Sequence, residues 1–148
     1  MKSLAAIALA GALVGRAASA AAGDLPALEK RALDRHMSDL TSCLAYYSIA
    51  QLALESAGDR ATAARVGEIR GALLDRSFIV MRAVEMGQET ALARQRAAVQ
   101  EQMALIDNDL GNFATLTEKY GHFCKAVVED PEHRIEHWKD RLQGGGRE

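Results

Sequence analysis

Residues 33–54 read LDRHMSDLTSCLAYYSIAQLAL and decide the fold class of this chain. Mostly apolar side chains recur there in steps of four and three residues, which is the period of an α-helix and not of a strand. The positions on this stripe are Leu33, Met37, Leu40, Leu44, Tyr47, Gln51 and Leu54. We therefore expect one long helix whose stripe faces the core of a helical bundle.

The same period returns in two later segments. One covers residues 66–84, where Phe78, Ile79 and Met81 widen the apolar face, and the other covers residues 99–120. Glycine ends helices because it adopts the left-handed backbone conformation easily, and aspartate caps the start of the next helix. The residues expected to end or cap these helices are Gly58, Asp59, Gly87 and Gly121.

A short last helix is expected after Asp130, because the proline at position 131 is tolerated in a first helical turn. Three long helices joined by short turns must alternate in direction. The sequence therefore predicts an all-α fold, an antiparallel helical bundle of three long helices plus a short C-terminal helix. We assign this bundle to residues 23–143 and a flexible, glycine-rich tail to residues 144–148.

Residues 1–22 have the features of a secretory signal peptide. Lys2 precedes an apolar run over residues 4–14, and the sequence ASA at 18–20 fits the pattern that signal peptidase reads. The alternative is an uncleaved membrane anchor, but the run is much shorter than the ~20 residues that a spanning helix needs, and Arg16 interrupts any extension. We expect an exported, periplasmic protein without a stable membrane anchor after signal cleavage.

The mature chain is mildly acidic. Removing residues 1–22 takes Lys2 and Arg16 from the 18 basic side chains, which leaves 16 against 20 acidic ones and a formal net charge of −4. A chain with this balance has no general attraction for nucleic acid or for an anionic membrane surface. We expect no nucleic-acid partner.

The chain has two cysteines, Cys43 and Cys124. In an oxidising compartment two cysteines most simply form a disulfide, although two free buried thiols or a bond between two chains are alternatives. Straight helices would hold this pair far beyond the ~7 Å limit on the Cα separation of a disulfide, so the bond requires a bend. The candidate bends are Gly71, residues 108–111 and Gly121. The unbroken stripe over residues 99–120 argues against the second.

A metal site is another interpretation of the C-terminal segment. His133 and His137 lie four residues apart, so on a helix they share one face and could bind one cation. His36, His122 and Cys124 could complete such a site. A structural zinc site normally has a second close pair of ligands, and PEHRIEHWKDR reads more simply as a charged, solvated helix face. Metal binding through His133 and His137 is therefore the alternative function.

Four aromatic side chains suggest a binding surface. Tyr47 lies on the core stripe, whereas Tyr46 lies on a neighbouring face with several alanines. A second packing face for another helix accounts for Tyr46 most simply. The sharper hypothesis is a groove between helices near Tyr46, Tyr47, Tyr120 and Trp138 that receives a protein or a small apolar ligand.

No sequence motif points to catalysis. The chain has no Cys-x-x-Cys redox pair, no Cys-x-x-Cys-His haem motif and no glycine-rich phosphate loop. Serine, histidine and aspartate occur, but no local signature pairs a nucleophile with a base. We expect no catalytic residue and no cofactor, and we interpret the protein as a periplasmic, non-catalytic helical module with a binding or structural role.

Two short motifs contain the two cysteines. A C-x-x-Y-Y segment begins at Cys43, and a K-Y-x-x-x-C segment ends at Cys124, shortly before Glu-Asp-Pro at 129–131. With these motifs the chain resembles, over most of its mature length, an uncharacterised family of small exported helical proteins of alphaproteobacteria, rhizobia among them. The family has no established activity, so the resemblance implies no catalytic residues. It implies an organised role for both cysteines.

Overall fold

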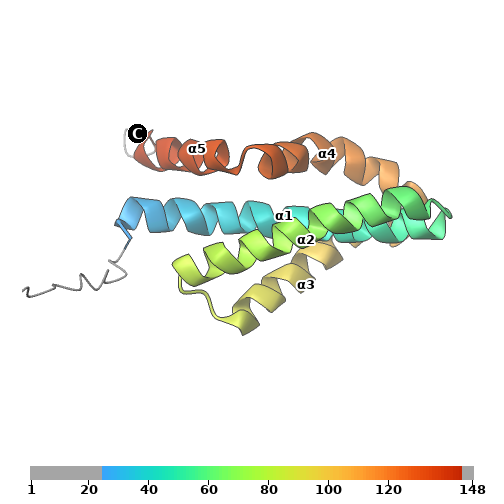
Figure 1. Ribbon diagram of the computed structural model, residues 1–148, viewed down its shortest axis with the longest axis horizontal. Coiled ribbons are helices and arrows are strands. Elements are labelled where there is room, and N and C mark those ends of the chain that lie inside the picture. Colours follow the sequence, from blue (N-terminus) through green and yellow to red (C-terminus); the bar gives the residue numbers. More distant parts are fainter. Residues whose placement is uncertain (1–24, 145–148) are drawn as a thin grey trace, which may run out of the picture.

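The computed structural model describes residues 25–144, which are helical and contain no strand (Figure 1). The elements are α1 (Ala27–Ser56), α2 (Arg60–Ala83), α3 (Gln88–Leu105), the 3₁₀ turn η1 (Leu110–Asn112), α4 (Phe113–Glu129) and α5 (Pro131–Gly144). The predicted all-α, disulfide-linked bundle is confirmed. The predicted signal peptide (1–22) and residues 145–148 of the predicted tail lie outside the described residues, whereas Gly144 is the last residue of α5.

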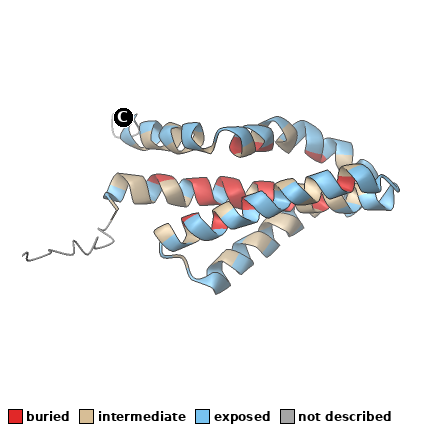
Figure 2. Ribbon diagram, viewed as in Figure 1, coloured by how far each residue is buried: buried red, intermediate tan, exposed pale blue. Residues whose placement is uncertain are grey.

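The long helix α1 is the centre of the bundle. It contacts α2, α3, α4 and α5, and Figure 2 shows the buried residues concentrated along its middle. The predicted stripe supplies Met37, Leu40 and Leu44 to the core, and Ala45 and Ala50 beside it are buried too. Because neighbours cover α1 on several sides, it buries a wider face than one stripe.

Local capping chemistry forms the turns before α2 and α5. Gly58 has a φ of 83°, which glycine adopts without steric cost, and the Asp59 carboxylate then accepts the N–H of Thr62 at 3.1 Å. In the same way the Asp130 carboxylate accepts the N–H of His133 at 3.1 Å in the first turn of α5. Both of these turns follow the punctuation in the sequence.

The expected third long helix is interrupted, which the unbroken apolar stripe did not indicate. Between α3 and α4 the chain turns through Asp107 and Asn108, whose φ angles are 54° and 56°. Asparagine and aspartate tolerate this left-handed region better than most residues with a Cβ atom. The Asp109 carboxylate accepts the N–H of Gly111 at 2.8 Å, so a backbone donor exposed by the break is satisfied.

The predicted helix end at Gly121 is wrong, because α4 runs through this residue. The apolar stripe continues on both sides of the break between α3 and α4. Ile106 before the break and Leu116 after it are 1% and 0% exposed, and both belong to the same hydrophobic cluster. Periodicity therefore identified the apolar residues correctly, but it could not show that the helix axis changes direction between them.

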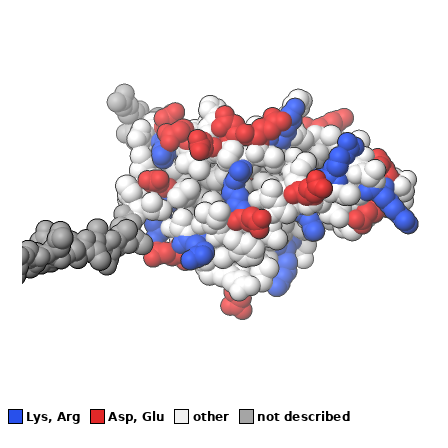
Figure 3. Space-filling view, viewed as in Figure 1, with Lys and Arg blue, Asp and Glu red and all other residues white. Residues whose placement is uncertain are grey.

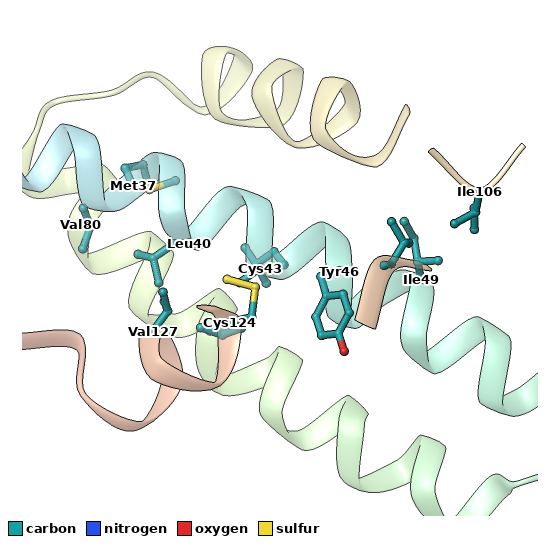
Figure 4. Close-up of a cluster of buried hydrophobic side chains, with 12 residues drawn as sticks. Met37, Leu40, Cys43, Tyr46, Ile49, Val80, Ile106, Cys124 and Val127 are labelled. Carbon is teal, nitrogen blue, oxygen red and sulfur yellow. A yellow bond between two sulfur atoms is a disulfide. The ribbon is translucent and has the colours of Figure 1, made fainter. Parts of the chain in front are cut away.

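The break also explains how the two cysteines meet. After it, α4 and α5 run back along α1 (Figure 1), and Cys124 lies beside Cys43 with a Cα separation of 5.3 Å. The two form a disulfide inside the hydrophobic cluster, and both are fully buried (Figure 4). The bend that permits the bond is at residues 106–112, the candidate that the stripe had argued against.

Candidate functional site

Three of the four predicted groove residues lie together. The ring of Tyr46 is 5.0 Å from that of Tyr47, 6.4 Å from that of Tyr120 and 5.6 Å from that of Phe113, on which it stacks. Tyr46 is only 7% exposed, so its ring is part of the core packing between α1 and α4. A shallow hollow beside it is lined by Thr117, Gly121 and Lys125, among others.

Trp138 lies elsewhere, on α5. Its Nε1 donates to Oδ2 of Asp39 at 2.8 Å. Since Tyr46 follows Asp39 by seven residues on α1, the indole nitrogen is bonded about 10 Å along the helix from the tyrosines. The four aromatic residues therefore do not form one groove.

The oxygen that Trp138 binds is also the acceptor of an ion pair. Arg134 donates to Asp39 Oδ2 from Nε at 3.2 Å and from Nη2 at 3.0 Å, and its guanidinium lies over the ring of Phe123 at 5.1 Å. Asp39 is 7% exposed. The interpretation of PEHRIEHWKDR as a solvated face is therefore wrong for Arg134, which lies one turn from Trp138 on the side of α5 that faces α1.

His36 lies beside this ion pair and is fully buried. Its Nδ1 is 4.0 Å from Asp39 Oδ2, and neither ring nitrogen has a hydrogen-bond partner within residues 25–144. Burial lowers the pKa of His36 to about 4, with smaller contributions from Arg76 and Arg134, while the Asp39 charge opposes the shift. At neutral pH the imidazole is therefore uncharged. The residues next to His36 in the sequence did not predict that its side chain is buried beside an ion pair.

The proposed metal ligands His133 and His137 lie on α5 and are not among the residues that donate to Asp39. His133 is exposed, and the ring of His137 lies 5.5 Å from that of Trp138. Residues 25–144 contain no group of three or more histidine, cysteine, aspartate or glutamate side chains placed to hold a metal ion. Cys124, which was considered as a further ligand, is in the disulfide.

A cavity of about 310 Å³ lies between α1, α2 and α3, and we call it the three-helix cleft. Figure 1 shows α2 and α3 diverging on one side of α1, and the two make almost no contact with each other. Much of the wall is apolar. The apolar side chains that line it are Met37, Leu44, Leu74, Phe78, Met81, Ala91 and Leu92.

The hydroxyl groups in the wall do not make the three-helix cleft polar. Thr41, Ser48 and Ser77 each donate to the backbone carbonyl four residues earlier in their own helix, at 2.8, 2.7 and 2.8 Å respectively. Their protons are therefore engaged inside the helices. Sequence reasoning missed this site, although the extra apolar residues around Phe78 were a signal that α2 has more apolar surface than one core stripe requires.

The two ends of the three-helix cleft differ chemically. Met37 and Met81 line one end, and Ser48 and Arg70 line the other. On α1 these ends are 11 residues apart, or about 16 Å. Arg70 is exposed and makes no ion pair or hydrogen bond within the described part of the chain. A cation therefore lies at one end of an elongated apolar wall.

Two glutamines hold α3 against α1 and so help to shape the three-helix cleft. The amide of Gln102 donates to the Ser42 carbonyl at 2.8 Å. About two turns earlier on α3, the amide of Gln95 lies 3.3 Å from the Thr41 carbonyl when oriented to donate to it. Because these bonds go to the backbone of α1, α3 is tied to α1 and does not close onto α2.

The face of the molecule in Figure 3 carries side chains of both charges, with acidic ones following the edge over α4 and α5. None of the described helices is both long enough and apolar enough to cross a membrane.

Comparison with family models, curated proteins and solved structures found no match to this chain. The resemblance to the alphaproteobacterial family stays a prediction.

Proposed function

We propose that the protein is an exported, periplasmic, non-catalytic binding module, and that its ligand is a small, elongated apolar molecule with an acidic group. The observation that carries this proposal is the three-helix cleft of about 310 Å³. Its volume is at the lower end of the range typical of small-molecule sites, and such sites are mostly apolar with a few polar groups that orient the ligand. Export rests on the signal-peptide features of residues 1–22.

Exposure of the wall supports a binding role. Leu74, Phe78 and Leu92 are 47%, 48% and 46% exposed although they lie around one cavity. Covering them with an apolar ligand would contribute roughly 25 cal/mol for each Å² removed from water. Arg70 at the end of the wall would pair with an acidic group on the ligand.

The same lining supports a role without catalysis. Arg70 is the one titratable side chain among the described residues that line the three-helix cleft. A guanidinium does not lose its proton in proteins, so it cannot act as a general base. The three hydroxyls are bonded to their own helices, and no imidazole lines the wall to activate them.

The experiment is a titration with two fluorescent probes, neutral N-phenyl-1-naphthylamine and the sulfonate 8-anilinonaphthalene-1-sulfonate. We expect saturable binding of both. Leu92→Gln should weaken binding of both about tenfold, because the buried apolar contact is lost. Leu105→Gln is the matched control, since Leu105 is 40% exposed on the same helix but does not line the three-helix cleft. Equal effects of the two substitutions would contradict the site.

A second pair of variants tests the acidic group. Arg70→Gln should weaken binding of the sulfonate several-fold and leave the neutral probe unchanged. Arg96→Gln, an exposed change on α3 outside the three-helix cleft, should affect neither probe. Loss of both probes in Arg70→Gln would indicate a structural role for Arg70 instead. Metal binding by His133 and His137, the alternative function, is supported only by their spacing.

A further inference from the structure

The exposed surface of α2 is unusually apolar, and part of it also lines the three-helix cleft. Leu74, Phe78 and Ile79 are 47%, 48% and 70% exposed. They account for half of the large exposed hydrophobic residues in the described chain, the others being Leu52, Leu92 and Leu105. Exposed apolar side chains scattered singly need no explanation, but a cluster on one helix marks an interaction surface.

Two charges frame this cluster. Asp75 and Arg82 are both exposed and lie seven residues apart on α2, which places them on the same side of the helix about 10 Å apart. Neither makes an ion pair with another residue in the range 25–144. Phe78 and Ile79 lie between them in the sequence, so the face reads acid, apolar pair, base.

This order is complementary to itself. If a second α2 packs antiparallel on the first, with the twofold axis between Phe78 and Ile79, Asp75 of each copy faces Arg82 of the other. Phe78 then faces Ile79 of the second copy. A twofold contact repeats each interaction, so both ion pairs form at once.

We propose that the protein forms a twofold homodimer through this face of α2, with the apolar pair at its centre and two reciprocal Asp75–Arg82 ion pairs beside it. A contact confined to one helix from each copy is at the small end of specific interfaces, so the dimer dissociates on dilution. Phe78 also lines the three-helix cleft, whereas Asp75, Ile79 and Arg82 do not, so variants at these three positions test the dimer without changing the wall of the cleft.

The test is analytical ultracentrifugation of the full chain over a range of concentrations. We expect a monomer–dimer equilibrium. Asp75→Arg and Arg82→Asp should each raise the dissociation constant at least about tenfold, because each places two pairs of like charges in contact. The double variant Asp75→Arg/Arg82→Asp should restore the dimer, since each new arginine again faces an aspartate.

Two further variants separate this face from other causes. Ile79→Gln should weaken the dimer, whereas Leu52→Gln, which removes a leucine that is 54% exposed on α1, should leave it unchanged. Circular dichroism checks that the variants remain helical. A monomer at every concentration, or a double variant no tighter than the single ones, would overturn the proposal.

Discussion

The Asp39 carboxylate accepts the indole N–H of Trp138 at 2.8 Å, although 99 residues separate the two. The same oxygen also accepts hydrogen bonds from Nε and Nη2 of Arg134. One buried oxygen on α1 therefore binds two side chains that lie one turn apart on α5. These hydrogen bonds hold α5 against α1.

Asp39→Asn tests that anchor. The substitution keeps an oxygen for Trp138 but removes the charge that faces Arg134, whose side chain is only 18% exposed. We expect a loss of about 2 kcal/mol in the free energy of unfolding, measured in urea, because a poorly solvated guanidinium is left without its counter-charge. Trp138 is the one tryptophan of the chain, so a red shift of its emission should accompany the loss.

The control for that experiment is Asp140→Asn, which removes an exposed carboxylate from the same helix. It should change neither stability nor emission. Unchanged tryptophan emission in Asp39→Asn would contradict the role of Asp39 in placing α5.

The disulfide between Cys43 and Cys124 should be a major source of stability. It spans 81 residues of sequence, and the chain-entropy model assigns roughly 4 kcal/mol to closing such a loop. Urea unfolding of the double variant Cys43→Ala/Cys124→Ala, compared with the oxidised protein, measures this difference. Intact mass before and after reduction should differ by two hydrogens. Two thiols that alkylate before reduction would show that the bond does not form.

His36 should make stability depend on pH. Its pKa is lowered from 6.5 to about 4, so the unfolded chain binds a proton more readily than the folded protein. The free energy of unfolding should therefore fall as the pH drops from about 6.5 to about 4, and this contribution levels off at lower pH. The full effect is on the order of 3 kcal/mol.

The variant His36→Leu should remove this part of the pH dependence. It should also keep or raise stability at pH 7.5, since neither ring nitrogen has a partner to lose among the described residues. Urea unfolding at pH 7.5, 5.5 and 4.5 measures both effects, with the exposed His122→Gln as control. An unchanged slope in His36→Leu would place the titrating group elsewhere.

The turn between α3 and α4 can be tested at Asn108, which is exposed and has a φ of 56°. Asn108→Val should destabilise the protein by about 1 to 2 kcal/mol, because a β-branched residue is strained in this conformation. Asn108→Gly should be neutral or stabilising. Thermal unfolding of the two variants separates backbone strain from loss of the side chain, since both remove the amide. Equal stabilities would contradict a left-handed turn.

Much of the fold could be predicted from local patterns. The stripe along α1 identified Met37, Leu40 and Leu44 as core residues, and all three are buried. The turns at Gly58 and Asp130 were predicted because capping depends on residues within three or four positions. Helical class and these boundaries depend on neighbours in the sequence, so one sequence was enough to obtain them.

The rest depended on tertiary structure. A stripe shows which side of a helix is apolar, but residues 106–112 keep the stripe while the axis turns, and only that turn lets Cys124 reach Cys43. The pairing of Asp39 with Arg134 joins groups 95 residues apart, which no local pattern encodes. Gln102 bonds to the backbone of α1 and so helps to hold α3 where it borders the three-helix cleft, and the partner of an amide is decided by packing.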